Sequence, residues 1–187
     1  EALARFLPTD ALLVTSHLQR THQTANAIRE AGLVMPEPHI EEDFAEQNFG
    51  DWQGQKREEV YAKLDAKHTF WLTPAHSRAP GGESFVDLTN RVTSVIDRLT
   101  AEHEGRDIIA VTHGGTIRAA IGHALGLDAE ASLTCQIDNC SVTRIDRFGP
   151  TESHPDGAWA MFHMNQIPTL DSVLAPDPTA MLAQVKR

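Results

Sequence analysis

Residues 107–127 have the sequence DIIAVTHGGTIRAAIGHALGL, and the rest of the chain is organised around this stretch. Its first part, Ile108 to Val111, is a short apolar run rich in β-branched residues, which predicts a buried strand. The part that follows the glycines predicts a helix. Between them lies His113-Gly114-Gly115, a turn that places free backbone N–H groups and the positive end of a helix dipole at one point.

This glycine turn is suited to binding an anion. The glycines allow a ligand to approach the main chain closely. A histidine at position 113 can hydrogen-bond an anion and can move a proton near neutral pH. We therefore interpret His113 and Gly114 as half of a phosphate site. The alternative is a tight turn with an incidental histidine, and this short motif alone favours neither interpretation.

A second strand and helix repeat the arrangement earlier in the chain. Residues 11–15, ALLVT, predict another short buried strand. Ser16 follows as a candidate N-cap, and Gln19 three residues later completes a capping box. We expect the helix to end near Ala31, just before Gly32.

Arg20 lies in the first turns of that helix, where the helix dipole disfavours a cation. An anion bound beside Arg20 would explain its position, and an exposed arginine without a role is the alternative. Two buried strands that each lead into a helix indicate a parallel or mixed sheet. Because ligands of such sheets bind at the carboxyl ends of the strands, we expect Arg20 and His113 on the same rim.

Residues 41–54, EEDFAEQNFGDWQG, predict a shaped loop rich in acids, aromatics and glycines. Glu46 lies there among Phe44, Phe49 and Trp52. Apolar surroundings favour the protonated form of a carboxyl group, which suits a general acid. A solvated loop carboxylate is the commoner alternative for a single glutamate.

The remaining elements follow from helix caps and periodicity. Ser84 and Asp87 resemble a capping box, and an apolar stripe from Phe85 to Leu99 follows at helical spacing. Glu83, just before this helix, is assigned a structural or pocket-rim role, with structure favoured. Further short helices are expected over Arg57 to Leu64, around Phe70 to Leu72 and from about Thr179, and further strands over Ser141 to Phe148 and Ala158 to Met164.

Composition restricts the class of protein. A length of 187 residues favours one domain, 1–187, with residues 169–187 as a C-terminal tail. The net charge of −10 argues against a nucleic-acid partner, and no apolar run is long enough for a membrane span. The two cysteines form no metal-type cluster, so we expect a cytoplasmic protein without a metal or cofactor. The oligomeric state is left open, with a homodimer as one option.

Four pieces of sequence stand in one order and together resemble the histidine phosphatase superfamily, in its phosphoglycerate mutase-like branch. They are SHLQRTHQTA at 16–25, EQNFGDWQG at 46–54, PGGES at 80–84 and THGG at 112–115. The resemblance covers about Ala2 to Leu170. It implies a three-layer α/β/α sandwich around a mostly parallel sheet, and catalysis through a phosphohistidine without a metal.

The resemblance also implies roles for single residues. Arg20 matches a phosphate-clamping arginine, and Glu46 matches the proton donor to the leaving group. His113 matches a phosphate ligand that stabilises the transferring group. Such roles suit phosphoryl transfer, which depends mainly on positioning and charge neutralisation. His17 stands where the family usually has proline.

One motif of the family is missing. Its first motif, R-H-G, supplies the nucleophilic histidine and another arginine, and it occurs nowhere in the 187 residues. We therefore expect that the chain begins after the first strand and the nucleophile loop. These residues alone are expected to be inactive on phosphate monoesters, to leave an open slot in the sheet, and to aggregate.

Three functions remain in competition. The first is a metal-independent phosphomonoesterase that acts on a small phosphorylated metabolite, with its nucleophile in the missing segment. The second is a phosphoglycerate-type mutase, ranked lower because residues 55–79 are short and lack a basic insertion. The third is a catalytically inactive module that binds a phosphorylated ligand or another protein.

Overall fold

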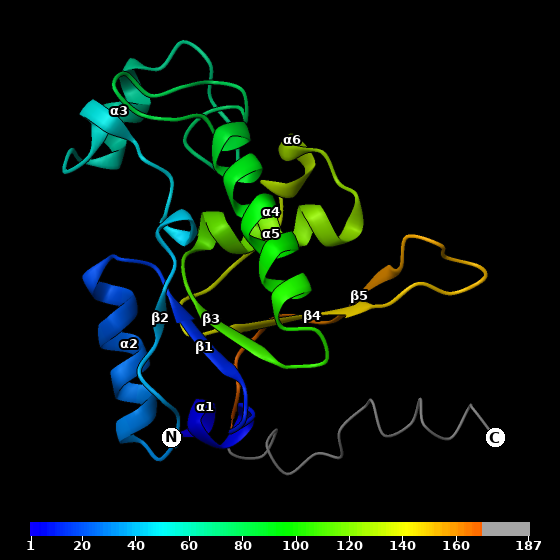
Figure 1. Cartoon of the computed structure of the whole chain (residues 1–187). Helices are drawn as coiled ribbons and strands as arrows, with labels where there is room; N and C mark the ends of the chain where they lie inside the picture. The colour runs from blue at the N-terminus through cyan, green and yellow to red at the C-terminus, as the bar shows by residue number, and fades with distance from the viewer. Residues whose placement is uncertain (170–187) are drawn as a thin grey trace.

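The computed structural model describes residues 1–169, in which a parallel sheet lies between two layers of helices (Figure 1). The sheet has the order β2 (His39–Ile40), β1 (Leu12–Thr15) and β3 (Ile108–Val111). Both pairings are parallel, and Thr15 at the end of β1 lies opposite Val111 at the end of β3. The two predicted strands are thus neighbours that end at the same rim.

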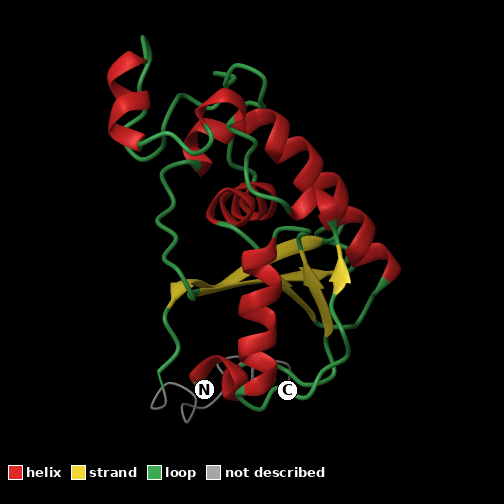
Figure 2. Cartoon of the chain, turned by 90° about the vertical axis from the view of Figure 1, so that its left-hand side faces the viewer, coloured by secondary structure: helices red, strands yellow, loops and turns green. Residues whose placement is uncertain are grey.

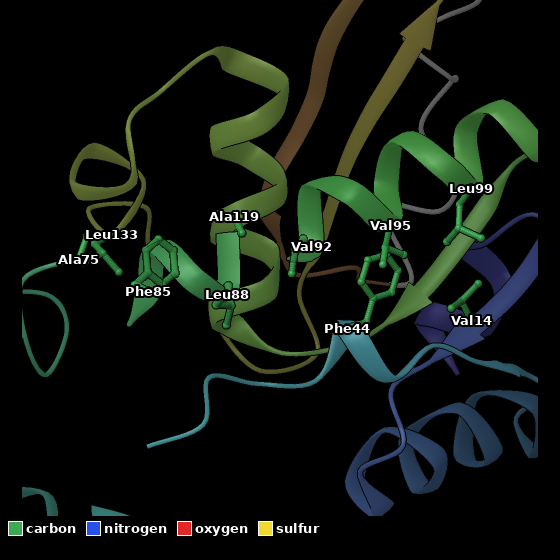
Figure 3. Packing of buried hydrophobic residues seen from close by; sticks show 10 residues of the cluster. All are labelled: Val14, Phe44, Ala75, Phe85, Leu88, Val92, Val95, Leu99, Ala119 and Leu133. Atoms are coloured by element: carbon green, nitrogen blue, oxygen red, sulfur yellow. The ribbon is translucent and has the colours of Figure 1, made fainter. Parts of the chain in front are cut away.

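Alternation along the strands separates two hydrophobic clusters. Leu13 and Ile109 belong to the cluster on the face covered by α1 (Ala2–Phe6) and α2 (Gln19–Glu30), whereas Val14 packs on the opposite face. There it meets Phe44 and the buried stripe of α4 (Phe85–Glu102) (Figure 3). The sheet therefore lies between helices on both sides, as Figure 2 shows, and the expected three-layer α/β/α class is confirmed.

The long helix α4 forms as its cap and periodicity predict. Ser84 Oγ accepts a hydrogen bond from Asp87 N at 3.2 Å, and Ser84 N donates to Asp87 Oδ2 at 2.7 Å. Leu88 and Val92 on the core side of the helix are fully buried. Helix α5 (Gly114–Leu125) packs across α4 and carries the glycine turn at its N-terminus. The two helices form the layer that positions this turn above the sheet.

The last two strands, β4 (Val142–Phe148) and β5 (Ala158–Gln166), form an antiparallel pair of their own. They lie beside α5 but share no hydrogen-bonded ladder with the three-stranded sheet. Among residues 1–169, β3 pairs only with β1, so its outer edge has no strand partner. Ala110 on β3 is exposed, in keeping with this free edge.

Other segments differ in detail from the sequence predictions. The expected helix at residues 57–64 is α3 (Arg57–Lys63), and a short helix α6 (Ala129–Ser132) follows α5. The helix expected around Phe70 to Leu72 is wrong, because these residues form bends. Trp71 is held there by tertiary contacts, including a 2.8 Å hydrogen bond from its indole Nε1 to Gln47 Oε1. The helix expected from Thr179 lies outside the described residues.

Candidate active site

The carboxyl ends of β1 and β3 bring two polar side chains together. Because Thr15 lies opposite Val111, the residues that follow the two strands meet across the rim. Ser16 Oγ lies 2.9 Å from Nε2 of His113, and both side chains are buried. His113 is the N-cap residue of α5, and Gly114 is the first residue of that helix.

Arg20 completes this cluster from the first turn of α2. Its Nε donates a hydrogen bond to Nδ1 of His113 at 3.1 Å. The expected placement of Arg20 and His113 on one rim is therefore confirmed. Within residues 1–169, the two terminal nitrogens of Arg20 have no hydrogen-bond or ion-pair partner. The guanidinium group thus keeps donors that an anion can use.

The hydrogen bonds assign the protonation state of His113. Nδ1 accepts from Arg20, so the ring proton lies on Nε2 and is donated to Ser16 Oγ. The Ser16 hydroxyl lies 3.1 Å from Thr21 Oγ1, and the Thr21 hydroxyl donates to the carbonyl of Leu18 at 2.8 Å. Read in this direction, each hydroxyl in the chain of bonds donates once and accepts at least once. The cluster is therefore satisfied when the imidazole is neutral.

This use of Ser16 corrects its predicted role as the N-cap of a capping box. Helix α2 begins at Gln19, and its N-cap residue is Leu18, which makes no side-chain capping bond. Ser16 Oγ accepts from Leu18 N at 3.2 Å, and its buried hydroxyl serves His113 instead. The sequence pattern fits a local cap, but the tertiary partner takes the side chain.

The pKa of His113 is lowered from its ordinary value of 6.5 to about 4. Burial is the largest cause of this shift, and the positive charges of Arg20, Arg91 and His17 add to it in that order. A buried imidazole among cations is neutral at pH 7. It becomes easier to protonate when an anion neutralises the nearest of those cations, Arg20.

Glu46 lies at the N-terminus of α5, on the other side of the glycine turn. Its Oε2 accepts from Gly115 N at 3.2 Å, and its Oε1 accepts from Gln47 N at 2.9 Å. A Cβ atom at position 115 would lie 2.2 Å from Glu46 Oε1, so only glycine leaves room for this carboxylate. The N–H of Gly115 at this helix N-terminus is thus taken by Glu46. Two backbone N–H groups and the N-terminal end of α5 therefore hold the carboxyl group of Glu46 in place.

A partly buried ion pair holds the Glu46 loop in place. Arg91 Nε and Nη2 lie 3.1 Å and 2.7 Å from the two carboxylate oxygens of Glu83. Arg91 Nη2 also donates to the Glu46 carbonyl at 3.3 Å, and Glu83 N donates to the Asn48 carbonyl at 2.9 Å. A Cβ atom at Gly82 would lie 2.3 Å from Asn48 O, so the PGGES and EQNFG motifs touch through their backbones. The structural role expected for Glu83 is confirmed.

Arg118 on α5 is a site residue that sequence reasoning missed. Its side chain is only 7% exposed, and its guanidinium carbon lies 4.7 Å from the centroid of the Trp71 ring. Its Nε has no hydrogen-bond partner among the described residues. Burial lowers the pKa of Arg118, and attraction to Glu46 opposes that effect. The signal was available, because Arg118 stands early in a helix, as Arg20 does, where a cation is disfavoured.

A hollow of about 560 Å³ opens beside this cluster. It is bounded by Arg20 and Glu46 on the rim side and by the loops 47–57 and 71–72 on the other sides. His113 does not line it, since Arg20 lies over its Nδ1. The residues around the hollow are Leu18, Arg20, Glu46, Gln47, Phe49, Trp52, Gln53, Gly54, Gln55, Arg57, Val60, Trp71 and Leu72.

The described residues contain neither a metal-type cluster nor a membrane-spanning helix. In residues 1–169, no three histidine, cysteine or carboxylate side chains are grouped as a bound metal ion would require. No helix in that range is long and apolar enough to cross a membrane. Cys135 and Cys140 are free thiols.

Comparison with known proteins identifies a matching family and several relatives. The sequence profile of the histidine phosphatase superfamily (branch 1) matches residues 1–153. A bifunctional protein of Mycobacterium tuberculosis is 29% identical over 156 residues, which are 83% of this chain and 41% of that protein. A 2,3-bisphosphoglycerate-dependent phosphoglycerate mutase of Gloeobacter violaceus is 29% identical over 174 residues, which are 91% of this chain and 75% of the mutase.

Solved structures agree with these relatives. A mycobacterial glucosyl-3-phosphoglycerate phosphatase in complex with inorganic phosphate superposes with a TM-score of 0.70 at 25% identity. The match covers 93% of this chain and 84% of the phosphatase. The chain thus spans most of the phosphatase structure, but less than half of the mycobacterial bifunctional protein, at 41% of its length.

His113 gives the site a testable dependence on pH. The unfolded chain has the ordinary imidazole pKa of 6.5 and the folded chain about 4, so between these values the unfolded state binds more protons. The free energy of unfolding therefore falls as pH decreases through this window, by up to about 3 kcal/mol at about 1.4 kcal/mol per pKa unit. Above pH 6.5 the imidazole is neutral in both the folded and the unfolded state. The free energy of unfolding then no longer depends on pH through His113.

We expect His113→Gln, which keeps polar atoms but no titrating group, to lose this part of the acid sensitivity. Urea unfolding at about pH 7, 5 and 4 measures it, with the exposed His76→Gln as the matched control. The control should keep the wild-type dependence on pH. If the free energy of unfolding depends on pH in the same way for His113→Gln and wild type, the pKa of His113 is not lowered by folding.

Proposed function

The chain belongs to the histidine phosphatase superfamily, and from that premise we propose that it hydrolyses phosphate monoesters through a phosphohistidine. The observation that carries this proposal is the cluster of Arg20, His113 and Ser16 on one rim of the sheet, with unpaired Arg20 donors beside the hollow. The proposed substrate is a small phosphorylated metabolite, and no metal takes part in the proposed reaction.

Arg20 and His113 would hold the phosphoryl group. The terminal nitrogens of Arg20 can donate to two phosphoryl oxygens in the planar geometry that guanidinium groups favour. His113 can donate to a third oxygen only if Nδ1 gains a proton, because Nε2–H is used by Ser16. The anion neutralises the charge of Arg20, which otherwise disfavours that proton. Phosphate binding and protonation of His113 are therefore coupled.

Glu46 would transfer the proton that the leaving alcohol needs. It lines the hollow next to Arg20, on the path that a leaving group takes away from the rim. The hydrogen bonds from Gln47 N and Gly115 N stabilise the carboxylate that remains after transfer. The same carboxylate can then remove a proton from water in the second step, as general acid–base catalysis requires.

The attacking histidine is proposed to lie in a segment that precedes residue 1. His113 is a poor nucleophile in this arrangement, since both its ring nitrogens are already hydrogen-bonded. No Arg-His-Gly motif occurs in the sequence, and the outer edge of β3 has no strand partner among the described residues. A strand that paired in parallel with this edge would end at the same rim as Ser16 and His113.

The proposed reaction has two steps. In the first, an imidazole nitrogen forms a bond to phosphorus, the phosphorus–oxygen bond to the alcohol breaks, and the alcohol leaves with the Glu46 proton. In the second, water attacks phosphorus, the nitrogen–phosphorus bond breaks, and inorganic phosphate leaves while Glu46 regains a proton. A mutase would replace this water with a second hydroxyl group, and one relative of the chain is a mutase.

The first experiment tests the reaction in the natural full-length protein. We expect hydrolysis of para-nitrophenyl phosphate to continue in excess EDTA. Rapid quenching with a ³²P-labelled ester should give a labelled protein that survives alkali and loses its label in acid. Transfer of the label to an added alcohol in place of water would favour the mutase. Absence of both turnover and label would favour the inactive binding module.

Replacing Glu46 tests its role as the proton donor. Glu46→Gln should reduce turnover of an alkyl phosphate about 10²- to 10⁴-fold, the usual scale for general acid–base catalysis. The loss should be smaller for para-nitrophenyl phosphate, whose leaving group departs without a proton. The exposed Glu42→Gln serves as the matched control and should retain activity on both esters. An equal loss on the two esters would assign Glu46 to binding or folding.

A further inference from the structure

The hollow beside the rim has walls that are mainly apolar. Two of the three tryptophans of the chain, Trp52 and Trp71, line it together with Phe49. Leucine and valine side chains add to these walls, and three glutamines also border the hollow. Apart from Arg20 and Glu46, which belong to the proposed reaction site, Arg57 is the only charged residue around it in the described chain. Such a lining matches an apolar ligand with few charges.

The hollow lies where the leaving group of a bound ester would extend. Arg20 and Glu46 form the boundary that the hollow shares with the rim cluster. An ester whose phosphoryl group lies at Arg20 and whose bridging oxygen faces Glu46 must extend away from the sheet. The hollow borders both residues, and its volume of about 560 Å³ can receive such a leaving group. The leaving alcohol therefore lies against the aromatic walls.

One aromatic wall is held rigidly. Trp71 donates from its indole nitrogen to Gln47 at 2.8 Å, and its ring stacks against the buried guanidinium of Arg118. Gln47 is itself only 2% exposed and donates to the Glu83 carbonyl at 3.0 Å. Phe49 packs beside Trp71 with 6.1 Å between ring centroids. This wall is therefore formed before any ligand arrives, which limits the entropy lost on binding.

Trp52 differs from the rigid wall. It lies in the 3-10 turn Gly50–Trp52, is partly exposed, and makes no side-chain hydrogen bond or ring contact within residues 1–169. A large, partly exposed ring that lines a hollow is available to a ligand. Aromatic rings favour other planar rings in stacked or edge-to-face arrangements.

We propose that the substrate is a phosphate monoester of an apolar alcohol that carries a planar ring, and that Trp52 contacts this ring. This inference rests on the proposed phosphatase function and names the substrate class of the same site. A leaving group with a carboxylate or a second phosphate fits less well, because a single cation, Arg57, is available to it. The hollow therefore selects for ring surface and against further negative charge.

The test compares esters with similar alkyl leaving groups in the natural full-length protein. Ethyl phosphate, 2-phenylethyl phosphate and 3-phosphoglycerate differ mainly in the ring or the charge that they carry. We expect kcat/KM to be at least about tenfold higher for 2-phenylethyl phosphate than for the other two, on the scale of burying one aromatic ring. Equal values, or a preference for 3-phosphoglycerate that Arg57→Ala removes, would overturn the proposal.

Amino-acid substitutions test whether the preference for 2-phenylethyl phosphate comes from the hollow. Trp52→Ala should lower kcat/KM for 2-phenylethyl phosphate about tenfold and leave ethyl phosphate within about twofold, whereas Trp52→Phe should keep most of the preference. Trp159→Ala is the matched control, because this indole lies on β5 outside the hollow. A preference that survives Trp52→Ala would also overturn the proposal. If Trp52→Ala fails to fold, Leu72→Ala removes a different part of the wall and carries the same expectation.

Activity on para-nitrophenyl phosphate separates this inference from the function on which it rests. A protein that hydrolyses this ester but ignores the ring of 2-phenylethyl phosphate is a phosphatase with another substrate class. A protein that hydrolyses none of the four esters contradicts the proposed function, and the substrate class is then wrong with it.

Discussion

The parallel pairing of β1 with β3 is the constraint on which the rest of the site depends. Its register places Thr15 opposite Val111, so Ser16 and His113 leave the sheet side by side and can share a 2.9 Å hydrogen bond. Helix α2 then begins within three residues of Ser16 and brings Arg20 to the other nitrogen of the same imidazole. A shift of one residue in this register would turn these side chains to the opposite face of the sheet.

Around the glycine turn, the charge of each group affects the charge or the binding capacity of the group beside it. Burial and the charge of Arg20 keep His113 neutral, and the N-terminal end of α5 is occupied by the carboxylate of Glu46. Glu46 in turn lies near the buried Arg118, to which it is attracted. A phosphoryl group that reaches Arg20 changes this balance, because it neutralises the cation nearest to His113. The unliganded site is thus ready to take up a proton together with its anion.

Local signals in the sequence were sufficient to predict most helices and strands and to predict that Arg20 and His113 lie close together. Short apolar runs, a capping box at Ser84 and the rule that ligands meet the carboxyl ends of parallel strands required no long-range information. The failures involve tertiary partners. Ser16 fits a cap pattern but serves His113, and the bends at residues 70–72 follow the contacts of Trp71 with Gln47 and Arg118. The hollow could not be predicted, since its walls come from separate loops.

The central claim is that the rim cluster holds a transferring phosphoryl group, and a crystal structure of the natural full-length protein with orthovanadate tests it most directly. The account predicts vanadium bonded to a histidine nitrogen from the segment before residue 1. Its equatorial oxygens should lie about 3 Å from the terminal nitrogens of Arg20 and from His113. Its remaining oxygen should face Glu46 at the mouth of the hollow. Vanadate bonded to His113 itself, or bound away from Arg20, would contradict the account.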